Sequence, residues 1–118
     1  MYQSGGTQLA SLFGQYIKER TNREIIENHI GFATYVIEKD SIYIEDVYVL
    51  PEYRKNNVAS DFVDQIAQIA KDKGLSKILT SVVPSANGST ISLMVCLKCG
   101  FKLDSSTNNF ILLLKEIE

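Results

Sequence analysis

The stretch DVYVLPEYRKNNVAS (residues 46–60) joins a predicted strand to a predicted helix. Its apolar run ends at a proline, a basic and amide-rich turn follows, and an amphipathic segment begins at Val58. A helix N-terminus carries unpaired backbone amides and a partial positive charge, so such a junction can hold an anion, and phosphate is a common guest. Taken alone, the stretch favours a phosphate site only weakly, because many helices begin with a solvated turn.

Outward from this junction, the spacing of apolar residues predicts one mixed α/β domain that spans residues 1–118. The strands on either side of the helix are expected to be parallel, because a helical crossover connects them. The remaining strands are expected to be antiparallel, and helices flank the sheet. The expected elements are a helix at 7–20 with Thr7 as N-cap, strands at 23–27, 30–38 and 42–50, a helix at 58–73, a strand at 77–83, a helix at 89–99, and strands at 101–104 and 109–117 joined by a turn at 105–108.

Composition excludes several classes of function. The chain has 118 residues, a net charge of −2 and no long run of one charge sign, which argues against nucleic-acid binding. Its longest apolar runs are far shorter than the roughly 20 residues of a membrane helix. The first residues lack the basic start and apolar core of a signal peptide, so we expect a cytoplasmic protein without a membrane partner.

The two cysteines, Cys96 and Cys99, have the spacing of half a zinc site or of a redox pair. A zinc site needs about four ligands, and His29 is the only histidine in the chain. Two reduced thiols near the end of a helix are therefore the favoured interpretation, and no metal is expected.

Three motifs in order resemble the GNAT superfamily of N-acetyltransferases. The sequence pattern V-x-P-E-Y-R at 49–54, with an alanine five residues later, resembles the family's acetyl-CoA-binding motif. IGFATY at 30–35 is similar to its central strand, and K-x-G-F at 98–101 is similar to the end of its last helix. The order of elements matches as well, although one helix precedes the first clear strand where the family has a strand and two helices.

The resemblance implies that acetyl-CoA is the co-substrate. In the family, the backbone of one strand pairs with the pantetheine arm, and the loop amides before the next helix hold the diphosphate. Carried over to this chain, the cofactor-binding residues are Val47, Tyr48 and Val49 of the strand, Arg54, Lys55, Asn56, Asn57, Val58, Ala59 and Ser60 of the loop and helix start, and Asn87 after the following strand.

Within the superfamily, the sequence IYIEDVYVLPEYR at 42–54 is most similar to the corresponding segment of the diamine acetyltransferases. The resemblance implies that Glu45 draws a proton from the acceptor amine and that Asp46 binds a substrate cation. Such chemistry is reasonable, because an alkylammonium must lose a proton before it attacks a thioester. The alternative is that both carboxylates merely face solvent at a strand edge.

Two departures from the family pattern affect the expected activity. Asn57 replaces the central glycine of the loop, and asparagine tolerates a left-handed backbone while adding bulk beside the phosphates. Cys96 stands where the family has a tyrosine that protonates the leaving thiolate, so Cys96 is the candidate for that role and an inert thiol is the alternative. The expected function is acetyl transfer to a small-molecule or protein amine, and a catalytically weak acyl-CoA-binding module is the alternative. The family also suggests a homodimer.

Overall fold

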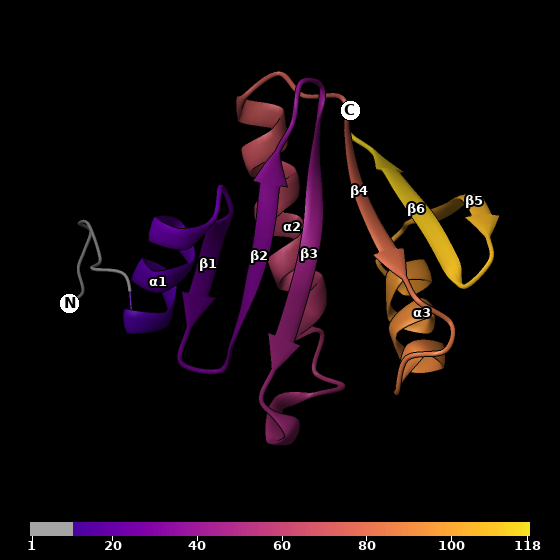
Figure 1. Cartoon of the computed structure of the whole chain (residues 1–118), viewed down its shortest axis with the longest axis horizontal. Coiled ribbons are helices and arrows are strands. Elements are labelled where there is room, and N and C mark those ends of the chain that lie inside the picture. The colour runs from indigo at the N-terminus through magenta and orange to yellow at the C-terminus, as the bar shows by residue number, and fades with distance from the viewer. Residues whose placement is uncertain (1–10) are drawn as a thin grey trace.

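The strand that carries the start of the quoted stretch lies inside a six-stranded sheet (Figure 1). The computed structural model describes residues 11–118. Its elements are α1 (Leu12–Arg20), β1 (Glu24–Asn28), β2 (Gly31–Ile37), β3 (Ser41–Val49), a short 3-10 turn (Pro51–Tyr53), α2 (Val58–Asp72), β4 (Lys77–Val82), α3 (Ser89–Lys98), β5 (Lys102–Thr107) and β6 (Phe110–Glu116). The strand order is β1-β2-β3-β4-β6-β5, and β3 and β4 form the one parallel pair in this sheet.

The predicted fold class is therefore confirmed, and most expected elements end within two residues of their observed bounds. The final hairpin is the exception. The turn expected at 105–108 is wrong, because β5 continues to Thr107 and the chain reverses at Asn108 and Asn109. Every residue of β5 is exposed, and the polar residues in its second half have the sequence pattern of a loop. The backbone of β5 is nevertheless paired with β6.

The first helix begins with a serine cap. Ser11 Oγ accepts a hydrogen bond from the Gly14 amide at 2.9 Å, which satisfies one of the unpaired amides of the first turn. The predicted cap, Thr7, lies outside the described residues. Of the apolar side chains in α1, Ile17 is buried, whereas Leu12 is 85% exposed.

Helices α1 and α2 lie on opposite faces of the sheet. Neighbouring residues of a strand point to opposite faces, and Gly31 and Phe32 of β2 show this clearly. A Cβ placed on Gly31 would lie 3.2 Å from the Phe62 ring of α2, whereas the Phe32 ring lies 5.1 Å from the Phe13 ring of α1. The same Cβ would lie 2.3 Å from the Tyr48 carbonyl oxygen, so this position of β2 requires glycine.

The two longer helices differ in how much of their surface is covered. Helix α2 buries Phe62, Val63, Ile66 and Ala70 against the sheet, where they join the main hydrophobic core. Helix α3 has no fully buried residue, and Ile91 and Met94 are more than 60% exposed.

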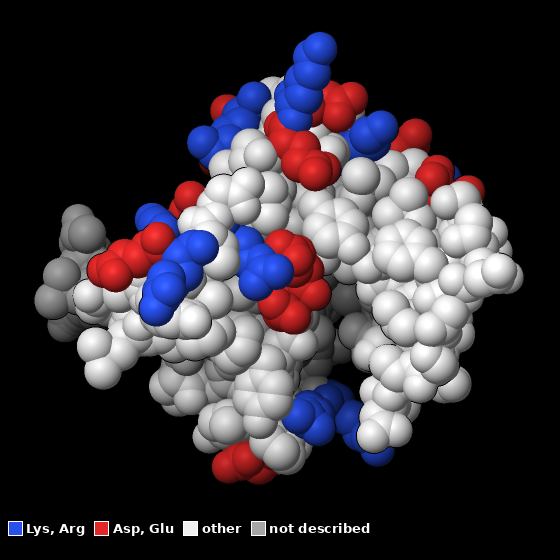
Figure 2. Space-filling model, in the orientation of Figure 1, with Lys and Arg blue, Asp and Glu red and all other residues white. Residues whose placement is uncertain are grey.

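In Figure 2 charged side chains gather toward the top and left of the view, while the right flank is almost uncharged. Within residues 11–118, no helix has the length and apolar character needed to span a membrane.

Candidate active site

Strands β3 and β4 are paired over only part of their length. The parallel ladder runs from Ser41 to Ile44 on β3, and Thr80 Oγ1 donates to the Ile44 carbonyl at its end (3.0 Å). At that point β3 contains a bulge, since Glu45 has no partner on β2 between the pairs made by Ile44 and Asp46. A bulge bends its strand, and beyond it the two strands diverge (Figure 1). We call this divergence the fork.

The fork leaves one edge of β3 without a strand partner. Within the described residues, β3 has no ladder to β4 from Glu45 to Val49, although it stays paired with β2 on its other edge. Figure 2 shows the surface hollowed in the central part of the same view. An unpaired edge presents backbone donors and acceptors to an extended ligand. The predicted pantetheine-binding residues, Val47, Tyr48 and Val49, lie on this edge.

The loop from Arg54 to Asn57, which we call the junction loop, connects the end of the fork to α2. Lys55 and Asn57 both have left-handed backbones, with φ of 69° and 62°. The expected tolerance of Asn57 for this conformation is therefore confirmed. Successive turns of this kind direct backbone N–H groups toward one concave side, which favours an anion.

The amides of this region are available to a ligand. Across the part of the chain that the structure describes, the backbone N–H groups from Lys55 to Ser60 donate to no protein acceptor. Asn57 caps α2 without a side-chain hydrogen bond, so the first helical amides of Val58, Ala59 and Ser60 also remain open. The predicted loop residues are thus brought together at one helix N-terminus.

Arg54 is held in place by the strand that precedes it. Its Nε donates to the Val49 carbonyl at 2.9 Å, and its guanidinium lies 5.5 Å from the centre of the Tyr48 ring. Both contacts come from the residues that form the unpaired edge of β3. The positive charge is therefore held against the end of β3, on the residue that directly precedes the open amides, before any ligand arrives.

Glu45 projects from the bulge and is engaged by a residue that the sequence did not single out. Arg23 Nε and Nη2 donate to the two carboxylate oxygens at 2.5 and 2.8 Å, which is a bidentate ion pair. Arg23 precedes β1, so its side chain crosses β2 to reach Glu45. The first position of a predicted strand gave no signal for this contact, because it depends on the register of three strands.

Asp46 follows the bulge and receives a hydrogen bond from Thr34 Oγ1 at 2.8 Å. The Thr34 side chain is buried, whereas Asp46 is exposed. The two carboxylates act on a common cation, because both Glu45 and Asp46 raise the pKa of the Arg23 guanidinium, Glu45 more strongly. The bulge thus brings the two predicted acceptor-side residues to one place.

Cys96 is half-buried against the core. Burial raises the pKa of its thiol to about 11, with a smaller contribution from Cys99. Burial also raises the pKa of Cys99, which a hydrogen bond with Ser60 at the start of α2 partly offsets. A thiol with a raised pKa stays protonated and is a weak nucleophile. Cys96 packs α3 against the core. The proposed role of Cys96 as a proton donor stays a prediction, and the weak acidity of its thiol disfavours that role.

Asn87 lies in the exposed loop between β4 and α3. The loop is fixed to the final hairpin, since the Ser85 amide donates to Asn109 Oδ1 at 2.9 Å. Gly88 then caps α3 with a φ of 76°.

At the base of the fork, the hydroxyls of Tyr43 and Ser81 are hydrogen-bonded to each other, which links β3 to β4 beside the last rung of their ladder.

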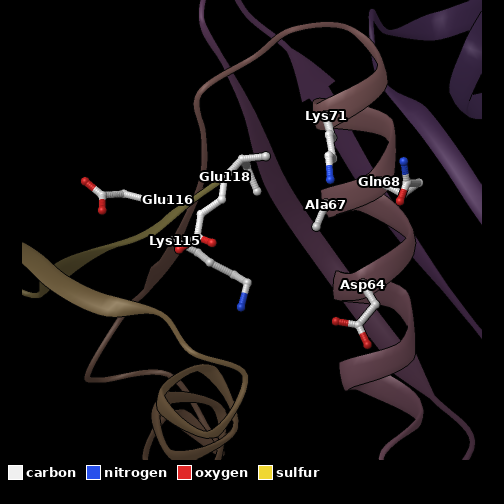
Figure 3. Close-up of a pocket in the computed structure, with 8 residues that line it drawn as sticks. Asp64, Ala67, Gln68, Lys71, Lys115, Glu116 and Glu118 are labelled. Atoms are coloured by element: carbon white, nitrogen blue, oxygen red, sulfur yellow. The ribbon is translucent and has the colours of Figure 1, made fainter.

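A separate shallow pocket of about 260 Å³ lies between α2 and the C-terminal strand (Figure 3). Charged side chains line it from both sides, Asp64 and Lys71 from α2 and Lys115 from β6. None of the predicted site residues lines this pocket. In the part of the chain from residue 11 onward, no group of three or more potential ligands is placed to hold a metal ion.

Comparisons with solved structures identify the fold. The PaiA N-acetyltransferase of Thermoplasma acidophilum in complex with coenzyme A superposes with a TM-score of 0.70 at 17% identity, over 86% of this chain and 65% of that one. An aminoglycoside 6′-N-acetyltransferase complexed with coenzyme A gives a TM-score of 0.70 at 14% identity, over 88% of this chain and 79% of that one. At such identities the likeness shows the fold alone.

Comparisons of sequence identify the family. Thialysine N-epsilon-acetyltransferase of Bos taurus is 42% identical over 59 residues, which are 46% of this chain and 35% of that protein. Its counterpart in Sus scrofa is 42% identical over 43 residues, which are 36% of this chain and 25% of that protein. The chain therefore matches about a third or less of the length of these relatives. The model of the acetyltransferase (GNAT) family matches residues 10–101, and the chain belongs to this family.

Proposed function

We propose that the protein is an N-acetyltransferase that moves an acetyl group from acetyl-CoA to a primary amine by direct attack. The observation that carries the proposal is the fork together with the junction loop. An unpaired strand edge leads directly to a helix N-terminus with six open amides, from Lys55 to Ser60. A ligand with an extended amide-containing arm and a diphosphate is complementary to both parts.

The donor side of the site would bind coenzyme A in two ways. The backbone groups of Val47 and Val49 that face the open edge would pair with the amides of the pantetheine arm, as a neighbouring strand does, and the Val49 carbonyl also accepts from Arg54 Nε. The open amides of the junction loop would hold the diphosphate, with the positive charges of Arg54 and Lys55 beside them. Asn87, in the loop after β4, would contact the arm from the other side of the fork.

The acceptor side would supply the proton transfer. Glu45 lies at the base of the fork, where the thioester of a ligand laid along β3 would end. Its carboxylate would take a proton from the acceptor's ammonium, directly or through water, so that the neutral amine attacks the thioester carbon. Asp46 would attract and orient the cation. Backbone N–H groups of β3 would stabilise the oxyanion that forms.

Collapse of the oxyanion would break the C–S bond and release coenzyme A as a thiolate. The nitrogen would lose its second proton and the thiolate would take up one, which completes the reaction. Cys96 and solvent are the two candidate sources of this proton, and the raised pKa of Cys96, about 11, makes its thiol a weak acid for this role. The C–N bond would form before the C–S bond breaks, and no covalent enzyme intermediate is required.

The acceptor is proposed as a primary amine on a small molecule or on a protein, as the curated relatives named for thialysine suggest. A cytoplasmic location and a homodimer remain predictions from the sequence. The family membership of the chain makes an active transferase the better proposal than a binding module without turnover.

Two linked measurements test the proposal. Calorimetric titration with acetyl-CoA is expected to show one site per chain, and saturating acetyl-CoA is expected to raise the melting temperature. Free thiol is then expected to appear when polyamines, amino acids with side-chain amines, aminoglycosides or peptides are added. Binding without thiol release across the panel would favour the binding module, and an absence of binding at millimolar acetyl-CoA would refute both.

A further inference from the structure

The ion pair between Arg23 and Glu45 has no role in the mechanism above. The two hydrogen bonds of the guanidinium occupy both oxygens of the carboxylate at 2.5 and 2.8 Å. The group that would receive a proton from the acceptor is thus already bound to a cation. Each oxygen keeps a further lone pair, but an ammonium that approaches Glu45 meets a cation that is already bound there and competes with it for the negative charge.

The charges around the bulge extend this point. Glu45 and Asp46 carry two negative charges, and both raise the pKa of Arg23, which keeps the guanidinium charged. Among the described residues, no other Lys or Arg forms an ion pair with either carboxylate. Arg23 therefore cancels half of the negative charge that would attract an amine, and it cannot itself be deprotonated at physiological pH.

The pair is placed where it can open. The side chains of Arg23 and Glu45 keep 34% and 27% of their surface exposed, so a competing cation and water can reach them. Ion pairs with this degree of exposure are weak enough for a well-placed ligand to displace. Arg23 also lies before β1 rather than within it, so its movement does not require a strand to break.

We propose that Arg23 sets the acceptor selectivity of the site by competing with the acceptor's ammonium group for the Glu45 carboxylate. The inference rests on the proposed function, because it assigns the acceptor to this carboxylate. A monoamine replaces one cation with another and gains little. An amine with a second positive charge within reach of Asp46 offsets the lost hydrogen bonds, so Arg23 discriminates against acceptors with a single positive charge.

The test compares binding of 1,3-diaminopropane and propylamine to the wild type, Arg23→Gln and Arg23→Lys. Binding is followed by the NMR shifts of the Glu45 and Asp46 backbone amides. Arg23→Gln is expected to bind each amine about three- to tenfold more tightly, with a smaller preference for the diamine. Arg23→Lys keeps the charge but loses the bidentate geometry, so its affinities are expected to lie between the other two.

Lys18→Gln is the matched control. Lys18 and Glu24 form the other ion pair among residues 11–118, at 3.4 Å. Glu24 is the first residue of β1 and directly follows Arg23. Lys18→Gln also changes the net charge by one, and the amine affinities are expected to stay unchanged. Equal effects of Lys18→Gln and Arg23→Gln would show a general charge effect and overturn the proposal.

The same proteins separate this inference from the proposed function. In thiol-release assays Arg23→Gln is expected to lower the KM for the amine while leaving the acetyl-CoA affinity unchanged. No gain in amine affinity, or no detectable amine binding to any of the proteins, overturns the role of Arg23. A gain in amine affinity in Arg23→Gln, without thiol release from any of the proteins across the amine panel, supports the role of Arg23 and refutes acetyl transfer. A purely structural role would instead lower the melting temperature and weaken amine binding.

Discussion

The two sides of the fork are built in opposite ways. On the donor side, the junction loop leaves its backbone amides open, and its main fixed side chain, Arg54, is held by the strand beside it. On the acceptor side, the side chains are already engaged: Glu45 binds Arg23, and Asp46 accepts from Thr34. The donor side is prepared for a ligand of fixed structure, whereas on the acceptor side an amine must compete with contacts within the protein.

This difference has a physical origin. Every acetyl-CoA molecule presents the same diphosphate and pantetheine arm, so backbone groups in a fixed loop would suffice to bind it in the proposed function. Acceptor amines differ in charge and length, and side chains are the means by which a fold adapts to them. Under our proposal, the ion pair between Arg23 and Glu45 adds selectivity, because only some cations offset its loss.

The largest expected effect concerns the acceptor side. Replacing Glu45 with Gln keeps the shape of the side chain but removes the base, and kcat is expected to fall about 10²- to 10⁴-fold. Acetyl-CoA affinity, measured by calorimetry, should remain unchanged, since the donor side is intact. Glu116→Gln is the control, because Glu116 lines the separate pocket beyond α2. An unchanged kcat in Glu45→Gln would remove Glu45 from the mechanism.

The next effect concerns the thiol of α3. The rise in the pKa of Cys96 from 9.0 to about 11 lowers its thiolate fraction at pH 8 about 100-fold. Alkylation by iodoacetamide, mapped by mass spectrometry, should be slower at Cys96 than in a short peptide by a similar factor. The rate should keep rising with pH until about pH 11, because the group remains protonated below its pKa.

A companion variant tests the catalytic role of the same residue. Cys96→Ala is expected to leave kcat within about threefold of the wild type, since a donor with so high a pKa contributes little general acid catalysis. A fall of kcat by two orders of magnitude, with the melting temperature preserved, would restore Cys96 as the proton donor.

A smaller effect is expected on the donor side. Arg54→Ala removes the charge beside the open amides and frees the Val49 carbonyl, so the Kd for acetyl-CoA should rise about tenfold. The affinity should also depend less on salt, because one ionic contact with the phosphates is lost. Lys102→Ala, on the exposed strand β5, is the control. If both variants bind acetyl-CoA like the wild type, Arg54 does not contribute to the phosphate site.

The same division explains what the sequence could predict. The donor side is continuous in the chain, so a short motif and the expected helix start were enough to locate Arg54 and Asn57. The contact joins Arg23, just before β1, to Glu45 of β3 across β2, and its geometry follows from a bulge in β3. A bulge leaves almost no mark in a pattern of alternating residues. The polar strand β5 was missed in part because it buries nothing.

The smallest expected effect concerns the residue that departs from the family pattern in the junction loop. Asn57 has a φ of 62°, which glycine adopts without strain, and its side chain makes no capping hydrogen bond to α2. Asn57→Gly should therefore lower the Kd for acetyl-CoA about threefold, roughly 0.6 kcal/mol, by giving the phosphates closer access. Asn57→Ala separates bulk from backbone strain, because it keeps a Cβ at positive φ and should destabilise the fold by about 1 kcal/mol. If Asn57→Gly instead weakens acetyl-CoA binding, the side-chain amide of Asn57 is itself a hydrogen-bond donor to the ligand. The replacement of the family's glycine by asparagine then adds a contact with the ligand.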